Sequence, residues 1–174
     1  MHKVLKLGRA LLGFGFAGML VSGQANATTA TANLSVTATV SASCSISTTA
    51  LGFGAYDPVG ANNASPLDGT GTVVVTCTSG AAAAVTLGQG ANAAAGSTDT
   101  LPIRRMKNAG GVFLSYSLYQ DNTHTTLWGN TALTSVAQTG TGTASSVTVY
   151  GRVPAGQNVA SGSYADTVVA TVTF

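Results

Sequence analysis

The sequence predicts an all-β protein, folded as one antiparallel β-sandwich. Several short stretches alternate apolar and polar residues with a period of two, as half-buried strands do. Thr (26 residues) and Gly (22 residues) are abundant, and both suit strands and turns better than helices. No window of a dozen residues shows the apolar stripe of an amphipathic helix.

Residues 1–27 have the three parts of a secretory signal peptide. The first nine residues carry three cations, an apolar run follows at 10–21, and Ala25-Asn26-Ala27 supplies the small-x-small pattern of a cleavage site. The apolar run is shorter than the roughly 20 residues that cross a bilayer, which argues against a retained anchor. We therefore expect a cleaved signal peptide and an exported product.

The two cysteines, Cys44 and Cys77, fit an exported protein. An even pair of cysteines in an oxidising compartment most often forms a disulfide. Closing a loop of about thirty residues contributes roughly 3 to 4 kcal/mol on chain-entropy arguments. The alternative, a redox or metal-binding pair, lacks CxxC spacing and a second pair of ligands.

The first and last predicted strands have the clearest alternation. The first covers residues 33–40, with polar residues on one face and an apolar opposite face formed by Leu34, Val36, Ala38 and Val40. The last covers residues 167–174, and its apolar face is formed by Val168, Ala170, Val172 and Phe174.

Between these ends, turn residues separate shorter predicted strands. Asp57-Pro58 and Asp68-Gly69 are predicted turn formers. The Ala- and Gly-rich stretch 88–112 is predicted to be a long mobile loop. About seven short strands joined by turns indicate an immunoglobulin-like sandwich, with intermediate strands at 72–78, 83–87, 114–119 and 147–150.

The two ends also suggest an incomplete sheet. The last predicted strand stops at Phe174, so no further strand follows to cover it. A sheet that lacks an edge strand exposes backbone donors and an apolar groove, and a spare strand from another molecule can fill it by β-strand addition. The predicted strand at 33–40 is uncharged and precedes the first cysteine, so it is a candidate for such a spare strand.

Several short motifs resemble the spore coat U domain family, which includes the major pilins of archaic (Csu-type) chaperone–usher pili. The resemblance covers essentially the whole chain after the predicted signal peptide. Each match is weak alone, and their order along one chain is a strong signal. The matching segments are 44–46 (CSI), 51–58 (LGFGAYDP), 75–78 (VTCT), 104–106 (RRM), 114–119 (LSYSLY), 128–129 (WG), 149–157 (VYGRVPAGQ) and 162–166 (GSYAD).

The resemblance implies a subunit with an incomplete immunoglobulin-like fold that lacks its last strand. A periplasmic chaperone lends a strand, and an outer-membrane usher exchanges it for the N-terminal strand of the next copy of the same pilin. By resemblance, residues 28–43 hold the donor strand (Leu34, Val36, Ala38 and Val40), and residues 44–174 form the pilin domain. The strand at 167–174 then borders the acceptor groove, and Cys44–Cys77 is the family disulfide.

The resemblance also implies a function and a location. The product is expected to be a structural subunit of a surface fibre that serves adhesion and biofilm formation, exported through the periplasm to an extracellular pilus. A tip adhesin at the end of the fibre is a further implied partner. The alternative is a monomeric secreted or coat-associated β-sandwich that binds a surface or a carbohydrate.

The composition argues against other classes of function. Only 7% of residues are charged, against about 25% in an average soluble domain, so no basic stripe for nucleic acid can form. We expect no enzyme, because no nucleophile motif accompanies the single downstream histidine, His124, which is predicted to be an exposed turn residue. We also expect no cofactor and no metal, although a calcium site built from several Asp is an open alternative without a DxDxDG loop.

Two further groups of residues admit two interpretations each. The run Arg104-Arg105-Met106-Lys107 is more readily explained as a solvated loop than as an anion-binding or surface-contact patch. Trp128 and the tyrosines are more readily explained as sandwich core than as a sugar-binding platform.

Overall fold

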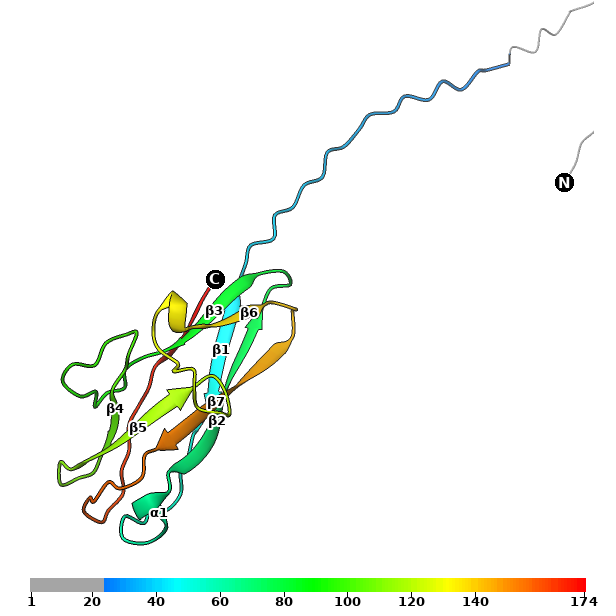
Figure 1. The fold of residues 1–174 in the computed structure, drawn as a ribbon. Helices are drawn as coiled ribbons and strands as arrows, with labels where there is room; N and C mark the ends of the chain where they lie inside the picture. The colour runs from blue at the N-terminus through cyan, green and yellow to red at the C-terminus, as the bar shows by residue number, and fades with distance from the viewer. Residues whose placement is uncertain (1–23) are drawn as a thin grey trace, which may run out of the picture. The chain divides into compact units, whose positions relative to one another are not determined.

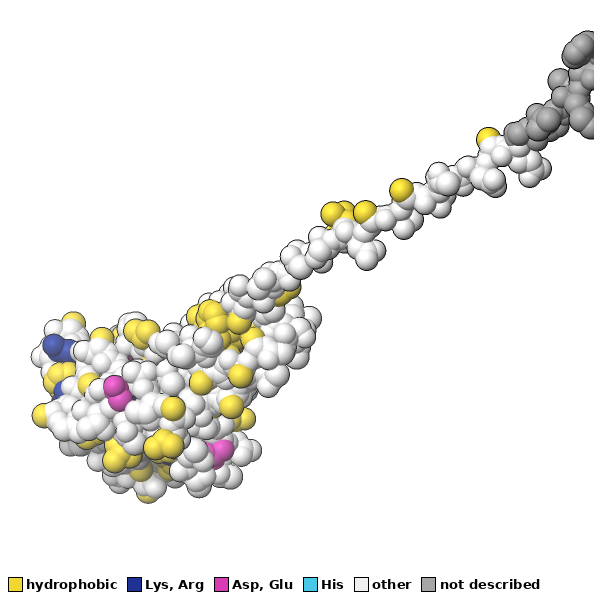
Figure 2. All heavy atoms as spheres, turned by 90° about the horizontal axis from the view of Figure 1, so that it is seen from above, with side chains coloured by type: hydrophobic (Ala, Val, Ile, Leu, Met, Phe, Trp, Pro, Cys, Tyr) yellow, Lys and Arg dark blue, Asp and Glu magenta, His cyan; other side chains and the backbone are white. Residues whose placement is uncertain are grey.

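The computed structural model describes residues 24–174, so most of the predicted signal peptide lies outside the described residues. The chain divides into two units, residues 1–38 and 39–174. Residues 24–38 contain no helix or strand, and every side chain among them is exposed. Their hydrophobic side chains stand in full view along the segment (Figure 2).

The second unit is an immunoglobulin-like sandwich of two antiparallel sheets (Figure 1). One sheet has five strands in the order β1-β2-β7-β5-β4, and the other has three in the order β6-β3-β8. A short helix, α1 (Ala61–Ala64), and a 3-10 turn (Ala132–Thr134) lie outside the sheets. The strands are β1 (Cys44–Thr49), β2 (Leu67–Cys77), β3 (Ala82–Leu87), β4 (Arg104–Lys107), β5 (Phe113–Tyr119), β6 (Val136–Thr139), β7 (Ala144–Val153) and β8 (Ala170–Thr173).

The core lies between the two sheets, and the period-two pattern places it there. Each central strand turns alternate residues inward, so the buried residues of β5 are Leu114, Tyr116 and Leu118. Trp128 is fully buried and donates its indole N–H to the carbonyl of Val85 at 3.0 Å, so its predicted place in the core is confirmed. The remaining core residues are Val73, Val75, Cys77, Ala83, Val85, Leu87, Val149 and Val153.

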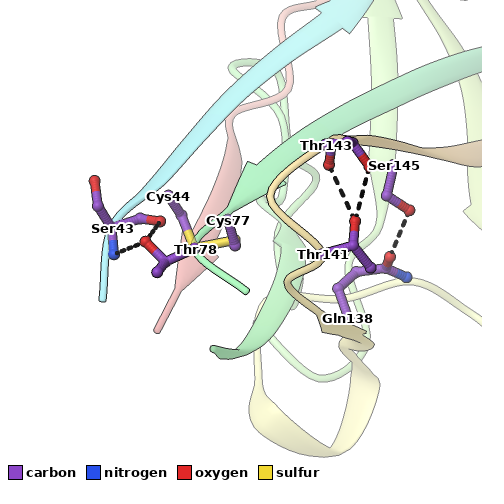
Figure 3. The surroundings of a disulfide bond; sticks show 8 residues. All are labelled: Ser43, Cys44, Cys77, Thr78, Gln138, Thr141, Thr143 and Ser145. Atoms are coloured by element: carbon purple, nitrogen blue, oxygen red, sulfur yellow. Dashed lines mark hydrogen bonds between the residues drawn. A yellow bond between two sulfur atoms is a disulfide. The ribbon is translucent and has the colours of Figure 1, made fainter. Parts of the chain in front are cut away.

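A disulfide joins the first residue of β1 to the last residue of β2. Cys44 and Cys77 face each other across the β1–β2 ladder, and their sulfur atoms are bonded at 2.04 Å (Figure 3). Hydrogen bonds between Ser43 and Thr78 add to this link: the backbone amide of Thr78 donates to the Ser43 carbonyl, and the Ser43 amide donates to Oγ1 of Thr78. The first strand of the sheet therefore begins immediately after residues 28–43, the predicted donor segment.

The prediction of one long loop at 88–112 is wrong in part, because the stretch contains strand β4. Arg104, predicted to be solvated, is completely buried. Its Nε donates to the Gly88 carbonyl and its Nη2 donates to the carbonyls of Leu87 and Trp128, at 2.8 to 2.9 Å. The buried guanidinium thus supplies hydrogen-bond donors to the carbonyls of three residues that surround it.

Two smaller predictions about local structure are also corrected. Asp68-Gly69 is not a turn but lies inside β2, where Asp68 is paired across the ladder with Arg152 of β7. Asp57-Pro58 does form a turn, in which Oδ1 of Asp57 accepts the backbone N–H groups of Val59 and Gly60. None of the helices in the described part of the chain is long and apolar enough to cross a bilayer.

Candidate functional site

An open groove runs along one side of the sandwich. It consists of two hollows of about 630 and 450 Å³, and four side chains line both of them: Leu51, Phe53, Met106 and Tyr164. Because these residues are shared, the two hollows form one continuous trough.

The groove has two walls and a floor. Residues 48–56 form the first wall, and residues 159–170 form the second. The hydrophobic core forms the floor, since Val73, Leu87, Tyr116, Leu118 and Val149 are among the residues that line the second hollow. The sandwich is thus open to its core along this side, which is the arrangement expected where an edge strand is missing.

The first wall has unpaired backbone. Within the described chain, no hydrogen bond joins a backbone amide or carbonyl of residues 50–56 to another group. Strand β1, which precedes this stretch, pairs with β2 on one edge only. The wall therefore offers backbone donors and acceptors to an added strand.

Glycines let the first wall lie close to the sheet beneath it. A Cβ on Gly71 of β2 would come within 3.0 Å of the Leu51 Cβ, and one on Gly151 of β7 would come within 2.9 Å of both Leu51 and Phe53. Any larger residue at these positions would push Leu51 and Phe53 out of their places. The glycines thus determine where the two apolar side chains of the wall sit.

The second wall is hydrogen-bonded on one side only. Lys107 and Ala165 exchange both backbone hydrogen bonds, and the amides of Ala91 and Gly88 donate to the carbonyls of Thr167 and Val169. Strand β8, which continues this wall, pairs with β3 alone. Cα atoms of β8 and β1 approach within 8 Å, yet the two strands are not paired, so each keeps a free edge.

The groove is apolar and carries little charge. Asp166 is its only carboxylate, and both carboxylate oxygens accept hydrogen bonds, from Asn92 and from the Tyr116 hydroxyl. Burial and the hydrogen bond to Asp166 raise the pKa of Tyr116 far above its usual range, so the phenol stays neutral. Such a site is suited to apolar side chains and a hydrogen-bonding backbone.

Comparison with known proteins assigns the family. The family model described as Spore Coat Protein U domain matches residues 30–171. The chain belongs to this family. It is also 54% identical over 127 residues to "Protein U" of Myxococcus xanthus. This match covers 71% of the present chain and 71% of that protein.

A solved structure shares the fold of this SCPU domain. It is a chain of the CsuC–CsuE chaperone–tip adhesion subunit pre-assembly complex from archaic chaperone-usher Csu pili of Acinetobacter baumannii. The TM-score is 0.53 at 21% identity, over 78% of the present chain. The match spans 40% of the solved chain, so only the fold is compared.

The groove residues predicted at the C-terminus of the SCPU domain divide into two pairs. Val168 and Ala170 line the groove. Val172 packs against the core outside the lining, and Phe174 lies beyond the end of β8 with 57% of its surface exposed. The strand covers Ala170–Thr173 rather than 167–174. Before it, the carbonyls of Val169 and Thr167 accept hydrogen bonds from the amides of Gly88 and Ala91, which follow β3.

The residues predicted as donor strand are not part of the sandwich's sheets. Leu34, Val36 and Val40 are 83 to 87% exposed, and no described residue between 24 and 43 belongs to a strand. Exposed large apolar side chains in a regular alternation are unusual for a segment that acts alone. These side chains form the apolar face expected for the predicted strand at 33–40.

The most important groove residues were not identified from the sequence. Leu51 and Phe53 alternate with two glycines in LGFG, but a Cβ on either glycine would meet nothing within 4 Å, so this motif does not signal the close approach that Gly71 and Gly151 allow. Met106 was assigned to a charged loop, whereas it faces the groove from β4. Tyr164 carries no local signal, because only the fold places it opposite Leu51.

His124 lies in a turn, as predicted, in which its backbone amide donates to the Asp121 carbonyl, but the prediction that its side chain is exposed is wrong. Its side chain is 7% exposed and is packed edge-on between the rings of Tyr119 and Tyr150. The backbone of His124 has a positive φ of 58°. Within residues 24–174, no three His, Cys, Asp or Glu side chains lie close enough together to hold a metal ion.

Proposed function

We propose that this SCPU protein is a structural pilin that polymerises by donating a strand to the next copy. Residues 28–43 of one molecule supply the strand, and the groove in residues 44–174 of the next accepts it. The supporting observation is the complementary pair of surfaces in one chain: an apolar trough with unpaired backbone, and an exposed segment with one apolar face.

Apolar burial and backbone hydrogen bonds would both favour strand addition. Residues 34–40 would span about 20 Å as an extended strand. Burying Leu34, Val36 and Val40 contributes roughly 5 to 9 kcal/mol as an upper bound. About eight backbone hydrogen bonds, each worth ~1 kcal/mol net, add to this.

The same physics requires partners before assembly. A subunit with an open core is prone to aggregation, so a periplasmic chaperone is expected to cover the groove and an outer-membrane usher to exchange the strands. Cleavage of residues 1–27 would release the donor segment for this exchange. The product would be an extracellular fibre, with adhesion and biofilm formation as its role and a tip adhesin at its end.

A pair of lysine substitutions tests the proposal. Val36→Lys places a charge on the apolar face of the donor segment, whereas Thr37→Lys places the same charge on the opposite face. In unheated detergent gels, wild-type protein and Thr37→Lys should run as a ladder of multimers that collapses to one band on boiling. Val36→Lys should lack the ladder but still form a complex with the chaperone.

Two results would count against the proposal. A normal ladder from Val36→Lys would show that this face is not buried on assembly. A single unheated monomer band from the wild-type protein would favour a monomeric sandwich that binds a surface or a carbohydrate.

A further inference from the structure

One stretch of the sandwich presents apolar and basic side chains together. From residue 101 to 104 the burial alternates: Pro102 and Arg104 are buried, whereas Leu101 and Ile103 are 65% and 45% exposed. Arg105 and Lys107 continue the outward-facing set, since alternate residues of a strand share a face. We call Leu101, Ile103, Arg105, Lys107 and Phe113 the basic–apolar patch.

The patch holds the only cations in the described chain that are neither buried nor paired with a carboxylate. Of the four Lys and Arg residues between 24 and 174, Arg104 is buried, and Arg152 forms an ion pair with Asp68 at 2.7 Å. Arg105 and Lys107 remain. On the face shown in Figure 2, the Lys and Arg side chains gather at one end of the domain, next to hydrophobic atoms.

The two cations are held in place by an aromatic ring. Phe113 lies opposite Lys107 in the β4–β5 ladder, and its ring centroid is 3.9 Å from the Arg105 guanidinium carbon and 5.6 Å from the Lys107 ammonium. Arg105 also donates through Nε and Nη2 to the carbonyls of Asn92 and Ala93. Because these contacts already hold the guanidinium in one position, the Arg105 side chain would lose little conformational entropy on binding an anion.

We infer that this patch binds the surface of an anionic lipid bilayer. The cations match the charge of acidic headgroups, and the exposed Leu101 and Ile103 suit the boundary between headgroups and acyl chains. An acidic polysaccharide would use the cations and the ring but has no apolar layer for Leu101 and Ile103, so a bilayer is the better match. A polymer that carries one patch per subunit would add many weak contacts together.

Vesicle flotation with the purified mature protein tests the inference. Vesicles of phosphatidylcholine alone are compared with vesicles that contain an equal part of phosphatidylglycerol, at low and high salt. The protein should float only with the anionic vesicles and at low salt. Arg105→Gln/Lys107→Gln should lower the partition coefficient about thirtyfold, and Lys107→Gln alone about fivefold, because each basic residue contributes separately.

Matched controls separate the patch from net charge and general hydrophobicity. Asn122→Asp/Asn158→Asp changes the net charge by the same amount at exposed sites outside the patch and should bind nearly as wild type. Leu101→Ser should weaken binding, whereas Leu133→Ser, at a leucine 95% exposed elsewhere, should not. Lys107 makes no side-chain hydrogen bond to a described residue, so Lys107→Gln tests the charge without disturbing the fold.

Three outcomes would overturn the inference. Equal binding of the double Gln variant and the wild-type protein would show that the patch is not involved. Binding to immobilised polygalacturonate that is unaffected by Leu101→Ser, without flotation on anionic vesicles, would assign the patch to a polysaccharide. Absence of binding to both probes would leave the patch without an anionic partner.

Discussion

The Tyr116 hydroxyl donates a 2.7 Å hydrogen bond to Oδ2 of Asp166, and this bond joins the floor of the groove to its second wall. The other carboxylate oxygen of Asp166 accepts hydrogen bonds from the amide and the side chain of Asn92. One carboxylate therefore connects the core, the groove wall and the 88–103 loop. The bond between Tyr116 and Asp166 attaches the second wall of the groove to the core beneath it.

Removing the Tyr116 hydroxyl tests this attachment. Tyr116→Phe should lower the free energy of unfolding by about 1 to 3 kcal/mol, because it leaves Asp166 with an unpaired oxygen. Urea unfolding followed by the fluorescence of Trp128, the single tryptophan, measures the change. Tyr119→Phe is the control, since no hydrogen bond joins the Tyr119 hydroxyl to a described residue. Equal effects of the two variants would argue against the attachment.

The glycine under the first wall should be needed for strand acceptance. Gly151→Val would drive a side chain into Leu51 and Phe53, and we expect the wall to shift, with a destabilisation of about 1 to 3 kcal/mol. Binding of a synthetic peptide of residues 28–43 to the chaperone-released subunit should fall at least tenfold. Gly110→Val, at a glycine outside the groove lining whose added Cβ would come no closer than 3.4 Å to Asn108, should bind the peptide normally. Normal binding by Gly151→Val would show that this wall need not be fixed.

The buried guanidinium of Arg104 should be among the most sensitive side chains. Arg104→Met leaves the carbonyls of Leu87, Gly88 and Trp128 without donors, at a cost of about 3 kcal/mol or more in urea unfolding. Burial lowers the pKa of Arg104 to about 10, so the group is still charged at neutral pH. Arg152→Met, at the exposed pair with Asp68, should cost no more than about 1 kcal/mol. A small loss in Arg104→Met would mean that water replaces the guanidinium.

The disulfide should contribute to the stability of the open subunit. Cys44→Ser/Cys77→Ser removes a link between residues 33 positions apart, which should lower the free energy of unfolding by roughly 3 to 4 kcal/mol. The same loss is expected when wild-type protein is unfolded in a reductant. If the reductant has no effect on wild type, the link is not stabilising the fold.

Acid should weaken the exposed Asp68–Arg152 pair. The two hydrogen bonds from Arg152 hold the pKa of Asp68 below its ordinary value of 3.8. A lowered folded pKa means that this stability is present above pH 3.8 and is lost as the pH falls through the folded pKa. Because Asp68 is 46% exposed, the contribution is only about 0.2 to 1 kcal/mol. Urea midpoints of wild type and Asp68→Asn should therefore differ at pH 7 and converge near pH 2; a difference that persists at low pH would contradict this.

The sequence alone was sufficient for the fold class and for the elements with a local signal. In strands such as β5 and β7 the alternation of apolar and polar residues is visible in the sequence, because successive side chains of a strand point to opposite faces of the sheet. The exposed apolar face at 34–40 and the turn at Asp57-Pro58 were likewise visible in a few neighbouring residues. Pairing of the two cysteines followed from their number and the predicted export.

Only the tertiary structure decided the groove. Leu51, Met106 and Tyr164 come from three distant parts of the chain, and they meet because β1 and β8 approach each other without pairing. The burial of Arg104 also depended on the fold, because its partners are carbonyls, which no residue type reveals. Local patterns record which side of a strand faces inward, whereas the place where two sheets fail to close is set by long-range contacts.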